Sequence, residues 1–186
     1  MVNLTNYVIT YSTILFLPRY ESGNLFTTVL DNSSPFVVEL EPTALIDLSL
    51  KYYGSSLRGA GDGANMILGK GKMYPVIVNE KLDLYWFPSK SPLKCDCIWF
   101  ALHHIEETIE LPNKRTQIIF SDGSTITIAI SKMSFDKKIQ IAYKLKGKLE
   151  SRTRGTPMHV SESRGLYHIA KNEKEINFNV IAQCQE

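Results

Sequence analysis

Apolar residues along the chain follow two spacings, one typical of strands and one typical of helices. Five segments combine β-branched and aromatic residues as strands do: residues 7–17, 36–40, 75–78, 82–87 and 98–107. The clearest local prediction is a hairpin in which residues 116–120 and 125–130 flank Asp122-Gly123, because this dipeptide supplies the positive φ of a tight reversal. One row of isoleucines should be buried on its second strand: Ile126, Ile128 and Ile130.

The first predicted helix opens at Glu41-Pro42-Thr43 and ends at Gly54, since proline suits a first turn and glycine a helix end. Apolar residues recur along it at helical intervals: Leu45, Leu48 and Tyr52. The glycine-rich stretch that follows, from Gly59 to Ala64, is expected to be a flexible surface loop.

A second predicted helix is amphipathic and has a basic outer surface. Its apolar stripe is spaced at three- and four-residue steps: Phe135, Ile139, Ala142, Leu145 and Leu149. Lys137, Lys144 and Lys148 fall on the opposite face. Ser134 is expected as the N-cap with Asp136 in the first turn, and the helix should end near Arg154-Gly155.

The C-terminal tail fits two patterns. Asn172 and Glu175 have capping-box spacing, and a helical repeat follows them: Ile176, Val180 and Cys184. Ile176, Phe178 and Val180 also alternate as a strand would, and of the two we favour the helix. Together these elements predict an α+β fold over residues 1–186, a single domain with a mainly antiparallel sheet and a few packed helices.

Composition fits one globular domain of 186 residues, 44% of them apolar. No apolar run approaches the roughly 18 to 20 residues of a membrane span, so we expect a cytoplasmic protein. Three cysteines suit free thiols better than a disulfide framework. Net charge is +2, yet residues 1–50 carry one cation against five carboxylates, whereas residues 137–164 carry eight cations against two.

The sequence contains no motif that supports an enzymatic site or a metal site. Cys95-x-Cys97 lacks the usual ligand spacing of zinc sites, and His103 and His104 should point to opposite faces of one strand. Gly59 to Ala64 matches a dinucleotide fingerprint without its strand and helix, and Lys70-Gly71-Lys72 is no phosphate-binding loop. A nucleophile elbow at Ser56 would need glycine where Arg58 stands. We therefore expect no enzyme, metal or cofactor.

An ordered set of short motifs resembles the ComK family, the competence transcription factors of Gram-positive bacteria. In chain order the set comprises Tyr52-Tyr53-Gly54-Ser55-Ser56, Trp86-Phe87-Pro88, Cys97-Ile98-Trp99, Phe120-Ser121-Asp122-Gly123-Ser124 and Ile130-Ser131-Lys132-Met133-Ser134-Phe135. The resemblance runs from about residue 51 to 149. Trp86, Phe87 and Trp99 are expected in the core or at a dimer contact rather than on bases.

The resemblance implies an activator of competence genes, at work in the cytoplasm on the nucleoid. It implies paired AT-rich promoter boxes in double-stranded DNA, recognised largely through the minor groove by dimers that associate into tetramers. RNA polymerase is an implied partner, and so are an adaptor protein and its AAA+ protease. They would act through a regulatory or oligomerisation segment around residues 155–186, where Gly165-Leu166-Tyr167-His168 matches the family's degradation signal only in part.

Basic residues in three regions are the candidate DNA contacts. We expect a glycine-rich loop to read groove width and the basic helix to hold phosphates. The candidates are Arg58, Lys70, Lys72, Lys94, Lys144, Lys148, Arg152 and Arg154, with Lys90 as a secondary one. The alternative function is a non-enzymatic protein-interaction module without sequence-specific DNA binding. A phosphate-ligand enzyme built on the glycine-rich loop is a third hypothesis.

Overall fold

The structure is a computed structural model that describes residues 3–69, 71, 73–154, 166–170 and 179–183. Two compact units make up the chain, Met1–Thr153 and Arg154–Glu186. The first unit contains two sheets and the helices that pack on them. The second contains the antiparallel pair β11 (Leu166–Ala170) and β12 (Asn179–Gln183).

A seven-stranded sheet runs through the first unit in the order β1-β4-β3-β2-β7-β6-β5. Its strands are β1 (Asn3–Leu4), β2 (Thr13–Glu21), β3 (Asn24–Asp31), β4 (Phe36–Val38), β5 (Val76–Asn79), β6 (Leu84–Pro88) and β7 (Trp99–Ala101). Every pairing is antiparallel except that of β1 with β4. A second, three-stranded antiparallel sheet has the order β10-β9-β8, from β8 (Ile105–Leu111), β9 (Arg115–Phe120) and β10 (Thr125–Ile128).

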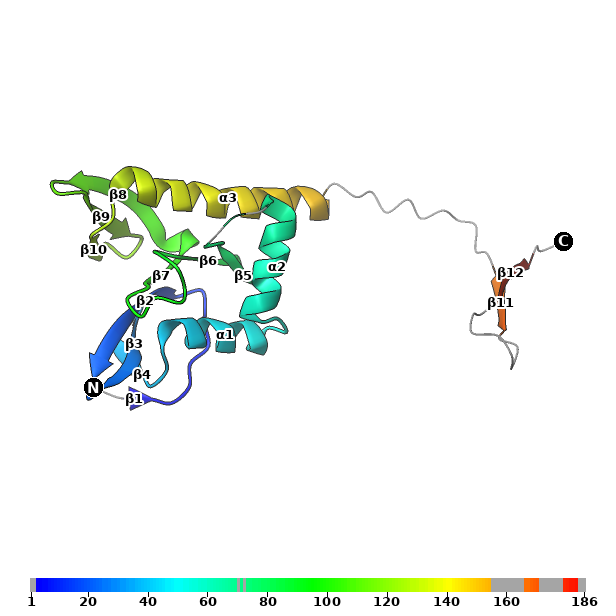
Figure 1. The fold of residues 1–186 in the computed structure, drawn as a ribbon, viewed down its shortest axis with the longest axis horizontal. Coiled ribbons are helices and arrows are strands. Elements are labelled where there is room, and N and C mark those ends of the chain that lie inside the picture. Colours follow the sequence, from blue (N-terminus) through cyan, green and yellow to red (C-terminus); the bar gives the residue numbers. More distant parts are fainter. Residues whose placement is uncertain (1–2, 70, 72, 155–165, 171–178, 184–186) are drawn as a thin grey trace. The chain divides into compact units, whose positions relative to one another are not determined.

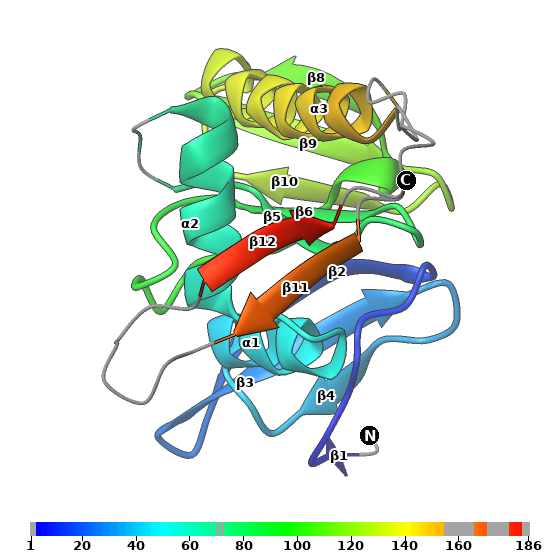
Figure 2. The same cartoon turned by 90° about the vertical axis from the view of Figure 1, so that its right-hand side faces the viewer.

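Helices lie on both sides of the larger sheet. They are α1 (Pro42–Tyr52), α2 (Leu57–Leu68), the 3-10 turn η1 (Leu102–His104) and α3 (Lys132–Arg154). In Figure 1, α3 runs along one side of the central strands and α1 lies on the other. Figure 2 shows α3 beside the smaller sheet, with β8, β9 and β10 side by side. This confirms the predicted α+β fold with a mainly antiparallel sheet.

Strand β6 separates two hydrophobic cores, because all five of its side chains are buried. Leu84 and Trp86 face a core that α1 and α2 close, while Tyr85 and Phe87 face a core that α3 and the smaller sheet close. The neighbouring β7 divides in the same way, with Trp99 toward the first core and Phe100 toward the second. Trp86, Phe87 and Trp99 are therefore core residues, one of the two predicted roles.

The buried stripe of α3 holds the helix against the second core, as predicted. Phe135, Ala142 and Leu145 are fully buried, and the Phe135 ring lies 5.1 Å from that of Phe100 and 5.7 Å from that of Phe87. The predicted N-cap is wrong by three residues. Ser131, which precedes the helix, accepts the Phe135 N–H at its carbonyl and donates its hydroxyl to Ser134.

Two more local predictions are confirmed. The hairpin of β9 and β10 turns at Gly123, whose φ is +80°, and buries Ile128 with Ile126 and Ile130 packed beside it. Helix α1 begins at the predicted proline and ends before Gly54, whose φ of +86° is one that glycine adopts without strain.

The predicted glycine-rich loop is wrong, because residues 57–68 form helix α2. Three glycines cost this helix roughly 1 kcal/mol each relative to alanine, and tertiary contacts offset that cost. The Ser56 hydroxyl caps the Gly59 N–H at 3.1 Å, and the Asp47 carboxylate accepts the Leu57 N–H at 2.8 Å. Buried Ala64 and the packing of Ala60 on the first core fix its inner face. Thus α2 is a second short helix directly after α1, and it is the one that sequence analysis did not find.

Two strand assignments and one helix assignment also need correction. Residues 98–107 are not one strand, because η1 interrupts them where the chain passes from the larger sheet to the smaller one. The first long strand begins at Thr13 rather than near residue 7. In the tail, residues 179–183 are strand β12 rather than part of a helix, since they pair with residues 166–170; the residues before and after them lie outside the described part.

Replacing Phe135 by alanine should lower the free energy of unfolding by about 3–5 kcal/mol, because the substitution leaves a cavity between α3 and two phenylalanines of the sheet. The matched control is Met133→Ala on the same helix, which is 80% exposed and should change stability by less than about 0.5 kcal/mol. Urea unfolding followed by circular dichroism measures both. Equal stabilities for the two variants would contradict this packing role.

Candidate nucleic-acid interface

Helix α3 carries the densest positive charge that the structure describes on any helix. Residues 132–154 contain eight cations against Asp136 and Glu150, a net charge of +6. Lys137, Lys144 and Lys148 are exposed and follow one another at steps of seven and four residues. Because such steps return to one side of a helix, the three ammonium groups lie on one face.

Contacts within the fold already engage several other cations of α3. Lys132 pairs with Asp136 one turn on, and Lys146 pairs with Asp83 at 2.5 Å and lies 5.5 Å from the centre of the Tyr85 ring. Lys137 and Lys144 form no ion pair with any described residue. They are the α3 lysines best placed to receive phosphates.

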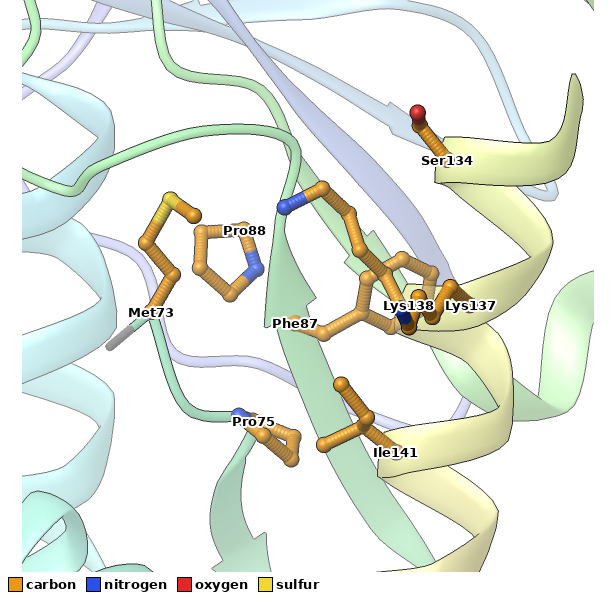
Figure 3. A pocket seen from close by; sticks show the side chains of 8 residues that line it. All are labelled: Met73, Pro75, Phe87, Pro88, Ser134, Lys137, Lys138 and Ile141. Atoms are coloured by element: carbon orange, nitrogen blue, oxygen red, sulfur yellow. The ribbon is translucent and has the colours of Figure 1, made fainter. Parts of the chain in front are cut away.

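A groove of about 370 Å³ borders the first turns of α3. Figure 3 shows Met73 and Pro75 across the groove from Lys137 and Lys138, with Phe87 between them. Burial lowers the pKa of the half-buried Lys138, because water no longer fully solvates its ammonium group. The lining is mainly apolar, with Ser134, Lys137 and Lys138 as its polar members.

Two of the α3 residues predicted to contact DNA also make contacts within the fold. Lys148 is exposed, yet its ammonium donates to the Ile67 carbonyl at 3.0 Å and so ties α3 to the end of α2. Arg152 is exposed and has a contact within the structure. Arg154 is the last residue of α3, and its side chain lies outside the described part, as do Lys70 and Lys72 entirely.

Arg58 does not join the α3 surface. It is exposed in the first turn of α2, whereas Ile67, at the other end of that helix, is the residue that meets Lys148. Nine residues at 1.5 Å each place Arg58 roughly 14 Å from Ile67 along the helix axis. Figure 1 shows this course of α2, from the end of α1 to α3. The idea that Arg58 sits on a mobile groove-reading loop is therefore wrong.

Lys90 and Lys94 lie in the loop of residues 89–98 that joins β6 to β7. Lys94 is exposed and forms no ion pair with a described residue. Lys90 pairs with Asp96 at 2.6 Å, and both side chains are well exposed. Exposed pairs contribute about 0–1 kcal/mol, so a phosphate could replace the carboxylate at little cost.

Sequence analysis placed Lys137 on the basic face of α3 but left it out of the candidate DNA contacts. Like Lys144, it is exposed and forms no ion pair with a described carboxylate. The signal that could have found it is the seven-residue step to Lys144. We add it to the candidate interface, which hereafter denotes Lys137, Lys144 and Lys148.

His103 and His104 do not face apart as predicted, because η1 replaces the expected strand. Both Nε2 atoms lie within hydrogen-bond distance of the Tyr11 carbonyl oxygen, at 2.8 and 2.7 Å. A carbonyl only accepts, so each ring donates from Nε2. The Ser121 hydroxyl then donates to His104 Nδ1 at 2.7 Å, while His103 Nδ1 is buried without a described partner. The two histidines thereby connect Tyr11 to η1, where the chain passes from the larger sheet to the smaller one.

The described residues offer neither a metal-binding cluster nor a membrane-spanning helix. They contain no cluster of three or more histidine, cysteine or carboxylate side chains that could hold a metal. Cys95 is exposed and Cys97 buried, and both are free thiols. No helix among them is long and apolar enough to cross a membrane.

Comparison with known proteins identifies relatives for the first unit. The family described as ComK protein matches residues 4–154, which is nearly the whole of that unit. The competence transcription factor of Bacillus subtilis (strain 168) is 26% identical over 149 residues, covering 80% of this chain and 78% of the relative. No solved structure matches.

Lowering the pH from 7 to 5 should destabilise the protein through His103. Burial lowers the pKa of this imidazole below its usual value near 6.5. The unfolded chain therefore takes up the proton first, and stability is lost as pH falls from about 6.5 through the folded pKa.

Urea midpoints at pH 7.5 and 5.5 measure this loss, which His103→Gln should reduce, since glutamine keeps a donor for the Tyr11 carbonyl. Asp47, Asp96 and Asp122 have lowered pKa values and titrate below this window. A His103 imidazole that titrates above 6.5 by NMR would refute the prediction.

Proposed function

The chain belongs to the ComK family, and on that premise we propose that it binds double-stranded promoter DNA at paired AT-rich boxes, largely through the minor groove. The family is one of transcription factors rather than enzymes, and its B. subtilis member is a competence transcription factor. This chain is accordingly a competence transcription factor, which acts in the cytoplasm. Association with the nucleoid is part of the proposal.

The observation that carries the DNA-binding proposal is the candidate interface on α3. Lysines on a rigid helix hold phosphates at fixed positions, and such contacts set the register of a protein on the duplex without reading sequence. Because the apolar stripe of α3 is buried, the opposite, basic face is exposed to solvent. Lys137 and Lys144 form no ion pair with a described carboxylate, so no such pair has to break before a phosphate binds. The exposed lysines of this face, unpaired among the described residues, thus support a phosphate-binding role for it.

Lys70 and Lys72 are the candidates for contacts in the minor groove. Lys70 and Lys72 follow in sequence the end of α2, which meets α3 through Lys148 and Ile67, and we retain both as minor-groove candidates. Arg58 belongs to the opposite end of α2, where it could contact a separate stretch of backbone. Arg152 and Arg154 would extend the phosphate contacts of α3 at its C-terminal end.

Assembly and control complete the proposal. Dimers bound to neighbouring boxes would associate across the spacer and recruit or stabilise RNA polymerase. Residues 155–186 would serve regulation or oligomerisation and, through the partial signal at residues 165–168, adaptor-guided proteolysis by an AAA+ protease. Their place in a compact unit of their own supports a separate role for this segment.

Fluorescence anisotropy over a salt series tests the DNA-binding proposal. A duplex with two AT-rich boxes should bind more tightly than a GC-rich duplex of equal length, because AT-tracts narrow the minor groove and concentrate negative potential there. A minor-groove competitor drug should release the protein. Equal, weak binding to both duplexes would instead favour a protein-interaction module.

Lys144→Ala should reduce the slope of log affinity against log salt by about 0.9, the share of one phosphate contact. Lys51→Ala is the matched control, an exposed helical lysine on α1 whose exchange removes the same charge from the other side of the sheet. That variant should leave the slope unchanged. Identical slopes for both variants would remove Lys144 from the interface.

A further inference from the structure

The tip of the loop of residues 89–98 exposes an apolar side chain that the fold does not use. Leu93 is 95% exposed, more than any other large apolar side chain that the structure describes. Single exposed leucines are common on proteins and by themselves indicate nothing. Leu93 differs from such residues because hydrogen bonds hold the loop that carries it in one conformation.

Hydrogen bonds fasten this loop at its base and near its tip. At the base, the Ser89 N–H donates to the Ile98 carbonyl at 2.7 Å, and the Ile98 N–H donates to the Ser89 hydroxyl at 2.9 Å. Near the tip, the Thr43 hydroxyl of α1 donates to the Pro92 carbonyl at 2.9 Å. Leu93 follows directly and is therefore held outward instead of folding back onto the surface.

The second half of the loop is held as well. The Lys94 N–H donates to the Ser91 carbonyl at 2.9 Å, and the Cys97 N–H donates to the Lys94 carbonyl at 3.0 Å. Cys97 is buried and its thiol donates to the Lys90 carbonyl at 3.4 Å. A side chain presented from such a loop loses little conformational freedom when it is buried by a partner.

Cations flank the exposed leucine. Lys94 follows it directly, and Lys90 lies three residues before it in an exposed pair with Asp96 that a phosphate can replace. A rigid apolar tip between two cations matches the chemistry of minor-groove proteins, which insert leucine, proline or similar wedges between base steps while cations meet the neighbouring phosphates.

We propose that Leu93 is an apolar wedge that enters a base step from the minor groove of the bound DNA. This inference rests on the proposed DNA-binding function and deepens it. Pyrimidine–purine steps such as TA unstack most readily, so insertion costs least in AT-rich sequence. The wedge thereby supplies selectivity for AT-rich boxes without hydrogen bonds to base edges, which in the minor groove are nearly degenerate.

The test uses the full-length protein and a two-box duplex in which 2-aminopurine replaces the adenine of one TA step. Insertion unstacks that base, so wild-type protein should raise its fluorescence at least about two-fold. Leu93→Ala should abolish the rise and lower affinity about ten-fold, with an unchanged salt slope because no phosphate contact is lost. Leu93→Phe should restore the rise, since phenylalanine also serves as a wedge.

Tyr52→Ala is the matched control, because it removes another exposed apolar side chain, one that lies at the end of α1 and outside both the loop and the α3 surface. It should leave fluorescence and affinity unchanged. A Leu93→Ala protein that unstacks and binds like wild type refutes the wedge and leaves the DNA-binding function standing. A wild-type protein without AT preference ends both proposals together.

A third result would also overturn the wedge. If Leu93→Ala binds and unstacks DNA normally but weakens self-association in analytical ultracentrifugation, the leucine contacts protein. Thermal melting of each variant accompanies these measurements, and a surface residue such as Leu93 should leave the melting temperature within about 1–2 °C of wild type.

Discussion

Burial of the β6–β7 pair on both faces is the constraint on which the rest of the first unit depends. Alternate side chains of these strands, Trp86 and Trp99 on one face and Phe87 and Phe100 on the other, each need an apolar cover. One layer of helices cannot supply both, so α1 and α2 close one face while α3 and the smaller sheet close the other. The orientation of α3 follows, because its apolar stripe has to meet the second core.

That orientation also decides which side chains of α3 reach solvent. Once Phe135 and Ala142 face the sheet, the lysines a half-turn away have to face water. Tertiary contacts then divide the cations of the helix into two groups. Lys146 pairs with Asp83, and Lys148 donates to the Ile67 carbonyl while it stays exposed, whereas Lys137 and Lys144 form no ion pair with a described residue. The basic surface is therefore narrower than the net charge of the helix suggests.

The same arrangement of layers stabilises two segments whose local sequences do not favour one conformation. Helix α2 forms in spite of its glycines because Ser56 and Asp47 satisfy its first N–H groups and the first core receives its inner face. The loop of residues 89–98 is held because Thr43 of α1 reaches the Pro92 carbonyl. Both segments thus owe one of their fastening hydrogen bonds to α1, through Asp47 and Thr43.

The sequence by itself determined the elements whose apolar residues repeat at a regular interval. These are α1, the hairpin of β9 and β10 and the buried stripe of α3, because each repeat records which side of a local element is buried. The motifs also sufficed to indicate the family. Tertiary structure alone decided the helical state of α2, the break at η1, the pairing of β12 with β11 and the choice between free and engaged lysines. Each of these depends on partners far apart in the chain, such as Asp83 for Lys146 and Ile67 for Lys148, which no local pattern records.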